Sequence, residues 1–188
     1  HEGIASLFSE DSAAFSAELS TKIATQYAFI IAKGFKVILN DINVLPRPTE
    51  LVFSLPGKLK KASIQPFIYQ GVIDGVSIFL AIGFTRSIPS QEEIEDEQEN
   101  KKRSSMGAGW SIICNDRAVV YCDKTELTGW GEANVPSFHN QYIAISGVVE
   151  FSCADASKLP TTTTKRGIDA SSTLYLRVKN KMREAMII

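Results

Sequence analysis

The chain has 188 residues, of which 44% are hydrophobic, and its formal net charge at pH 7 is −1. That composition suits one globular domain with a sizeable core, and the near-neutral charge argues against a general nucleic-acid or membrane-surface binder. No apolar run approaches the roughly 20 residues of a membrane-spanning helix, no signal peptide is recognisable, and the three cysteines form no C-x-x-C pattern. We therefore expect a cytoplasmic protein in which Cys114, Cys122 and Cys153 are buried free thiols.

An amphipathic helix is predicted over residues 12–33, because apolar side chains recur there at every fourth position. The stripe consists of Phe15, Leu19, Ile23, Tyr27 and Ile31. We expect this stripe to pack into the core. A short strand over residues 35–39 and a turn complete an entry segment, which we place at residues 12–45.

The middle of the chain, residues 63–151, predicts a sheet built mainly from hairpins. The expected strands are 63–72, 76–86, 110–114, 117–122 and 142–151. Asp74-Gly75 and Asn115-Asp116 fit tight turns between successive strands. A run of charged residues at 90–105 predicts a flexible acidic insertion, and residues 123–140 are expected to be irregular.

The last part of the chain predicts a polar loop followed by a basic helix. The loop, residues 158–167, holds four threonines, two adjacent cations and a closing glycine. The helix is expected over residues 169–188, with Asp169 or Ser171 as its cap. Helices outside a run of antiparallel strands predict an α+β fold with the helices on one face of the sheet, in a single domain over residues 1–188.

Conventional catalytic and metal-binding patterns are missing from the sequence. His139 is the only internal histidine, and with three scattered cysteines it supplies neither a metal site nor a nucleophile–base pair. Neither GxxxxGK[ST] nor GxGxxG occurs. In the 158–167 loop, Lys165 could contact a terminal phosphate as a compact point charge. The alternative is a surface cation before a helix, and spacing alone favours that second interpretation.

Four segments near the end of the chain carry a family resemblance. They are Ile145–Phe151 (ISGVVEF), Ala154–Pro160 (ADASKLP), Thr161–Arg166 (TTTTKR) and the basic helix. This block resembles the segment after the nucleotide-binding domain in GHKL ATPases, which include the ninety-kilodalton heat-shock chaperones, MutL and the B subunits of type II topoisomerases. More weakly, Trp110–Val120 resembles a hairpin of the same domain, and Ser20–Val44 resembles the helix and strand that enter it.

The resemblance implies a transducer fold like the second domain of ribosomal protein S5. It also implies that Lys165 contacts the γ-phosphate of ATP held by a neighbouring domain, with Thr163, Thr164 and Arg166 beside it. Thr163 stands where the topoisomerases carry glutamine, and whether Lys165 or Arg166 makes the contact stays open.

The magnesium-binding asparagine, the DxGxG motif and the glycine-rich lid of these ATPases do not occur in the chain, which also lacks an initiator methionine. We therefore expect a fragment that is inactive alone. In the full-length ATPase we expect ATP and Mg to bind an N-terminal domain of the same chain, and we expect a homodimer.

Two other functions are compatible with the sequence, and neither involves a membrane. The first is a nucleic-acid-binding module of the S5-like kind that uses the basic face of Lys158–Arg183. The second is a protein-interaction scaffold. The residues before His1 would discriminate, because an ATPase needs an ATP-binding motif there.

Overall fold

The structure is a computed structural model that describes residues 12–47, 65–85 and 107–187. Its contacts divide the described residues into two compact units. The first comprises residues 12–47 together with Asp116–Ala118, and the second comprises the remaining described residues. The charged insertion predicted at 90–105 lies outside the described residues, and the single domain expected over 1–188 stays a prediction.

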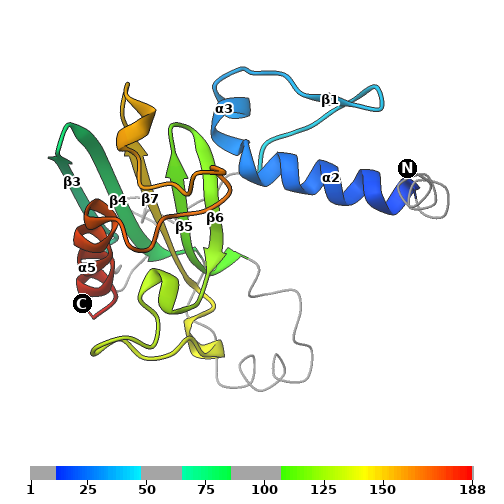
Figure 1. The fold of residues 1–188 in the computed structure, drawn as a ribbon. Helices are drawn as coiled ribbons and strands as arrows, with labels where there is room; N and C mark the ends of the chain where they lie inside the picture. The colour runs from blue at the N-terminus through cyan, green and yellow to red at the C-terminus, as the bar shows by residue number, and fades with distance from the viewer. Residues whose placement is uncertain (1–11, 48–64, 86–106, 188) are drawn as a thin grey trace. The chain divides into compact units, whose positions relative to one another are not determined.

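The first unit consists of two consecutive helices and a small hairpin (Figure 1). The helices are α2 (Ser12–Gln26) and α3 (Ala28–Ala32), and the strands are β1 (Ile38–Leu39) and β2 (Ile42–Asn43). The predicted helix is therefore present, but it is interrupted at Tyr27. Asn40 and Asp41 have positive φ angles of 49° and 62°, as a two-residue type I′ turn requires.

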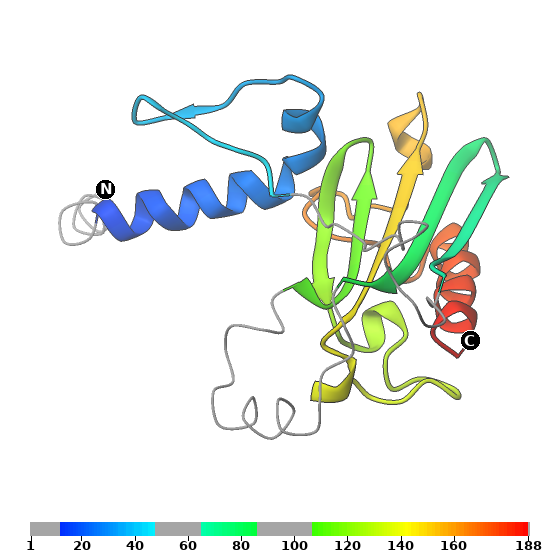
Figure 2. The same cartoon turned by 180° about the vertical axis from the view of Figure 1, so that it is seen from behind.

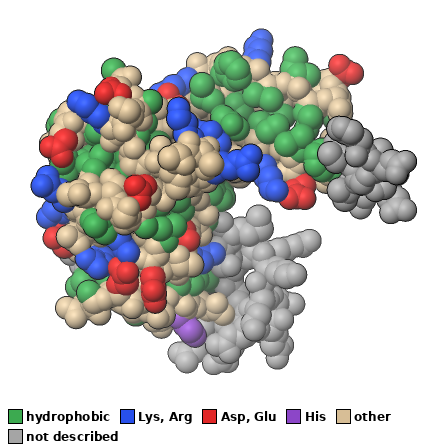
Figure 3. Space-filling model, viewed as in Figure 1, with side chains coloured by type: hydrophobic (Ala, Val, Ile, Leu, Met, Phe, Trp, Pro, Cys, Tyr) green, Lys and Arg blue, Asp and Glu red, His purple; other side chains and the backbone are tan. Residues whose placement is uncertain are grey.

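The apolar stripe predicted along the first helix does not form a buried face, so that prediction is wrong. The buried hydrophobic residues of the first unit are Ala24, Ala28 and Val44, whereas Phe15 is 49% exposed. Residues four apart advance by about 40° around a helix with 3.6 residues per turn, so five such residues spread over about 160°. Apolar side chains consequently remain on the surface of this unit (Figure 3).

The second unit is built on a five-stranded sheet in the order β3-β4-β7-β5-β6, although the first two residues of β6 group with the first unit. The strands are β3 (Phe67–Ile73), β4 (Val76–Phe84), β5 (Gly109–Cys114), β6 (Arg117–Asp123) and β7 (Ile145–Ser152). Two hairpins, β3–β4 and β5–β6, flank the central strand β7. Strand β7 runs antiparallel to β4 but parallel to β5, with Ile112 opposite Val149. The fold is therefore α+β as predicted, and the sheet is mixed: its neighbouring strands are antiparallel except for the parallel pair β5–β7.

Both predicted hairpin turns of the sheet are confirmed. Asp74 and Gly75 have φ angles of 52° and 81°, and Asn115 and Asp116 have φ angles of 46° and 67°. Asparagine, aspartate and glycine tolerate this left-handed conformation better than other residues do, and the type I′ turn matches the twist of paired strands.

Helix α5 (Thr173–Ile187) covers one face of the sheet (Figures 1 and 2). Its buried residues are Leu174, Tyr175, Val178, Met182 and Ala185, which confirms the predicted helix and most of its stripe. They pack with apolar residues of the sheet such as Leu80, Trp110 and Phe151. Full burial of one such side chain contributes about 1.5–3 kcal/mol.

The cap of α5 differs from the prediction. The N–H of Tyr175 donates to the hydroxyl of Ser172 at 3.5 Å, which makes Ser172 the capping residue. Asp169 instead accepts hydrogen bonds from the N–H and the hydroxyl of Ser171 at 3.0 and 2.6 Å. Asp169 therefore shapes the turn before the helix.

Candidate functional site

The predicted phosphate-contacting loop is a small hairpin whose two legs are anchored in the second unit. Thr161 and Ile168 form an isolated antiparallel bridge, and the N–H of Thr162 donates to the carbonyl of Gly167 at 3.0 Å. Pro160 and Ile168 are buried at the base. The N–H of Asp169 also donates to the carbonyl of Pro160 at 2.9 Å. These contacts fix the base of the hairpin, so its tip has a defined place.

The tip of this hairpin consists of Thr163, Thr164, Lys165 and Arg166, all of which are exposed. The N–H of Lys165 donates to the carbonyl of Thr162 at 2.8 Å and closes a tight turn. The hydroxyls of Thr162 and Thr164 lie 3.3 Å apart. The structure thus places the four predicted site residues, which are consecutive in the sequence, at the exposed tip of this hairpin.

Lys165 has an unusual backbone conformation. Its φ angle is +54°, in the left-handed region that lysine rarely occupies. Such a residue costs on the order of 1 kcal/mol and persists where the surrounding structure imposes it. Here the imposing contacts are the closed turn and the bridge below it. The strained conformation turns the chain at Lys165 and leaves its side chain in solvent.

The cations of α5 differ from those of the hairpin because carboxylates pair with them. Lys179 and Arg183 both contact Glu132, at 2.8 and 3.1 Å. Lys181 pairs with Glu184 at 2.7 Å. Arg177 lies 4.0 Å from Asp74 in the β3–β4 turn. Much of the positive charge that the sequence places on this helix is thus balanced.

No such pairing is found for the two hairpin cations within residues 12–47, 65–85 and 107–187. Neither Lys165 nor Arg166 makes a hydrogen bond or ion pair to a described side chain. The hairpin tip therefore carries two adjacent positive charges with free donors. That arrangement can bind an anionic oxygen from outside the second unit.

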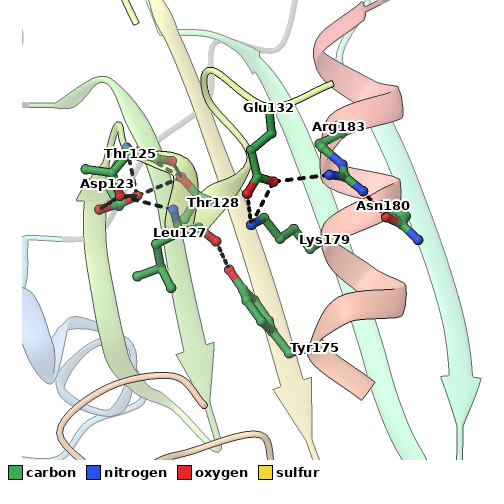
Figure 4. Close-up of polar contacts among 9 residues, drawn as sticks. All are labelled: Asp123, Thr125, Leu127, Thr128, Glu132, Tyr175, Lys179, Asn180 and Arg183. Atoms are coloured by element: carbon green, nitrogen blue, oxygen red, sulfur yellow. Dashed lines mark hydrogen bonds and ion pairs between the residues drawn. The ribbon is translucent and has the colours of Figure 1, made fainter. Parts of the chain in front are cut away.

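Sequence reasoning missed a polar network between α5 and residues 123–140 (Figure 4). Glu132 accepts from Lys179 and Arg183, and the hydroxyl of Tyr175 donates to the carbonyl of Leu127 at 2.6 Å. Burial of Tyr175 raises the pKa of its hydroxyl, which keeps it a donor. The network ties the segment after β6 to the middle of α5.

A second part of this network shapes the start of the segment (Figure 4). The carboxylate of Asp123 accepts hydrogen bonds from Thr125 at 3.0 Å and from the buried hydroxyl of Thr128 at 2.8 Å. Thr125 also caps a short 3-10 helix, Glu126–Thr128. The spacing of an aspartate and two threonines was the available signal, since such side chains commonly bond to nearby backbone.

The three cysteines are free. Cys114 is buried, and that burial raises the pKa of its thiol to about 12. Cys122 and Cys153 are only half-buried, so the prediction of buried thiols holds for Cys114 alone. Burial also raises the pKa of Cys122. A raised pKa lowers the thiolate fraction at neutral pH, which makes Cys114 and Cys122 poor nucleophiles.

Two further features are absent from the part of the chain that the structure describes. No group of three or more histidine, cysteine, aspartate or glutamate side chains is placed to hold a metal ion. None of the helices there combines the length and the apolar character needed to cross a lipid bilayer.

Comparisons with known proteins assign no family. No protein-family model matches the chain, and no curated protein matches it. Among solved structures, the chain is similar to the B-subunit of the DNA gyrase from Myxococcus xanthus, with 12% sequence identity and a TM-score of 0.40. The alignment covers 66% of this chain and 34% of that chain, so the match spans about a third of the gyrase chain. A likeness this distant supports no functional argument.

Proposed function

We propose that the chain is the transducer segment of a GHKL-type ATPase, in which Lys165 contacts the γ-phosphate of ATP bound by another domain. That domain would lie N-terminal in the same protein, with ATP and Mg as its ligands. Contact with the γ-phosphate would exist before hydrolysis and be lost after it. Nucleotide state would thereby control the position of the second unit, in a protein that acts as a homodimer.

The observation that carries the proposal is the placement of Lys165. The residue stands at the tip of an anchored hairpin, in a left-handed conformation that costs energy, with an exposed and unpaired ammonium group among the described residues. Strained residues of this kind concentrate at functional sites. An ammonium group there suits the charge that develops during phosphoryl transfer. The resemblance of residues 145–183 to GHKL transducers is the reason for proposing ATP as the phosphate-bearing ligand.

The decisive experiment measures ATP hydrolysis by the natural full-length protein and its Lys165→Asn variant. Asparagine tolerates the left-handed conformation, so this change removes the charge while keeping the turn. Loss of one phosphate contact costs about 2–4 kcal/mol in the transition state, so kcat should fall by about 30- to 1,000-fold. Binding of ATP itself should change much less, because the other domain holds the nucleotide.

Two variants complete the experiment. Arg166→Ala tests the neighbouring cation and shows which of the two makes the contact. Lys181→Asn is the matched control, since Lys181 is another exposed lysine and pairs with Glu184 at 2.7 Å. An unchanged kcat in both Lys165→Asn and Arg166→Ala would refute the phosphate contact. The absence of an ATP-binding motif upstream of His1 in the gene would refute the ATPase proposal altogether.

A further inference from the structure

Among the residues that the structure describes, no strand pairs with the outer edge of β3. Strand β3 is the outermost strand of the described sheet, next to β4, and lies at the free edge in Figures 1 and 2. Its seven residues, FIYQGVI, include no charged residue and no proline. Its register with β4 runs from Phe67–Ile82 to Ile73–Val76 without a bulge. Charge, proline and bulges are the devices that normally prevent an edge strand from pairing.

The opposite edge of the same sheet has these protections. Strand β6 begins with Arg117 and ends with Asp123. Cys122 has a φ angle of +49°, which interrupts the regular extended backbone near the end of the strand. The contrast indicates that an open β3 is a specific property of one edge.

The side chains of β3 alternate in a way that leaves an apolar surface at this edge. Ile68 is 50% exposed and Val72 is 69% exposed, and the residue between them, Gln70, is also exposed. The intervening residues, such as Tyr69, are half-buried and pack against the core. Exposed aliphatic side chains on an unpaired edge are typical of a surface that a partner covers.

The backbone groups of the same three residues point outward. In a two-residue hairpin the first pair after the turn, here Ile73–Val76, exchanges hydrogen bonds, and hydrogen-bonded pairs then alternate along the ladder. Ile68, Gln70 and Val72 therefore occupy the non-bonded positions, so their N–H and C=O groups face the open edge. Three outward residues offer six hydrogen-bonding groups.

This edge is self-complementary. If two copies of β3 pair antiparallel about a twofold axis at Gln70, Ile68 of each copy lies opposite Val72 of the other. Gln70 lies opposite itself, so all three outward residues of each copy form hydrogen-bonded pairs, with six hydrogen bonds in total. Cross-strand aliphatic pairs stabilise such a ladder. A two-residue shift of register would leave outward groups unpaired.

The charges near this edge also permit a second copy to approach. Asp74 in the β3–β4 turn and Arg177 on α5 are both exposed and lie 4.0 Å apart. They have opposite signs, so two copies would not repel each other there.

We propose that two copies of this chain associate through their β3 strands, forming a continuous ten-stranded sheet with Gln70 on the twofold axis. The inference does not rest on the proposed ATPase function, because it needs neither nucleotide nor another domain. The partner that covers the exposed edge of β3 is thus a second copy of this chain.

The test uses Gln70→Cys in the 188-residue chain. Directly opposed residues of a hydrogen-bonded antiparallel pair have Cα atoms about 5.5 Å apart, within the disulfide range of about 4.4–6.8 Å. Mild oxidation should therefore give a covalent dimer as the major product. Ser77→Cys is the matched control, because Ser77 is exposed on the same face but one strand further in, opposite Val72. It should not cross-link, nor should the wild-type chain with its three native cysteines.

Light scattering provides the reversible test, at about 100 µM because small interfaces are often weak. The wild-type chain should have twice the 20.6 kDa mass of the monomer. Gln70→Pro removes only an outward N–H, and Val72→Lys places a charge opposite Ile68, so each should give a monomer whose tryptophan fluorescence is unchanged. A monomeric wild type, or a dimer that survives both changes, would overturn the proposal. Failure of Gln70→Cys to cross-link would indicate another strand or another surface, and would overturn it too.

Discussion

Glu132 allows a sharp prediction about the stability of the second unit. Its carboxylate contacts Lys179 at 2.9 and 2.8 Å and Arg183 at 3.1 Å. The side chain of Lys179 is only 12% exposed as a whole, so loss of the Glu132 charge leaves a cation on a largely buried side chain without its carboxylate partner. Exposed ion pairs contribute about 0.2–1 kcal/mol, whereas an unpaired buried charge costs more. We expect Glu132→Gln to lower the free energy of unfolding by about 2 kcal/mol.

Tryptophan fluorescence is a suitable readout. The two tryptophans of the chain are Trp110 and Trp130, and both are buried in the core of the second unit. Urea unfolding followed by their fluorescence therefore reports this unit without the first. In a thermal scan, a loss of about 2 kcal/mol corresponds to a fall in Tm of about 7–10 °C for a unit of this size.

The pH dependence of this difference follows from the pKa of Glu132. The hydrogen bond from Lys179, together with the charges of Lys179 and Arg183, lowers that pKa below its ordinary value of 4.5. A lowered carboxylate pKa stabilises the folded state above the unfolded pKa, and this stabilisation is lost as pH falls through the folded value. The gap between wild type and Glu132→Gln should thus stay constant above about pH 5 and close at lower pH.

The matched control is Glu184→Gln. Glu184 pairs with Lys181 in an exposed i,i+3 arrangement, and such pairs contribute about 0.2–0.5 kcal/mol. If Glu132→Gln costs no more than Glu184→Gln at neutral pH, the double ion pair does not tie α5 to residues 123–140. A gap that does not narrow at all between pH 5 and pH 3 would show that the loss has a cause other than charge.

Two further stability predictions concern close contacts in the same unit. Gly147→Ala should destabilise by at least 2 kcal/mol in urea unfolding, because a Cβ there would lie 2.4 Å from the ring of Trp110; Gly167→Ala, with nothing within 4 Å, should be nearly neutral. Tyr175→Phe should lower the free energy of unfolding by about 1–3 kcal/mol, because the carbonyl of Leu127 loses its 2.6 Å hydrogen bond. An undiminished free energy of unfolding would show that water replaces the hydroxyl.

The parts of the fold that the sequence predicted are those with local signals. Asp74-Gly75 and Asn115-Asp116 predict turns because these residue types tolerate the left-handed conformation that such turns require. Helix α5 is predictable because its apolar residues follow the helical period and meet one continuous core. The stripe of α2 follows a strict period of four instead, and none of its residues is among the buried residues of the first unit.

The order of strands could not be predicted in the same way. Strand β7 pairs with β5 across a gap of 30 residues and separates two hairpins that are each local in sequence. No turn residue or period encodes that choice, because it depends on which hairpin edge the last strand joins. The mixed sheet is therefore a tertiary property.

In the candidate site, too, part of what the structure shows was predictable from the sequence and part was not. The sequence singled out Lys165 from residue type and resemblance, and the structure adds its exposed position and its φ of +54°. The left-handed conformation was unpredictable, since lysine does not favour it. It follows from the closed turn at Thr162 and the bridge between Thr161 and Ile168, contacts that no residue type in the loop announces.

The pairing of charges weakens the nucleic-acid alternative for a physical reason. The basic residues of Lys158–Arg183 look equivalent in sequence, but Glu132 and Asp74, which balance three of them, lie 45 or more residues away. Each neutralised phosphate contributes about −0.9 to the slope of log K against log salt. Among the described residues of this stretch, only Lys165 and Arg166 lie away from every carboxylate, and two neutralised phosphates give a slope of about −2. That is far below the steep dependence of a dedicated nucleic-acid binder, whereas two adjacent cations suffice to contact a single nucleotide phosphate.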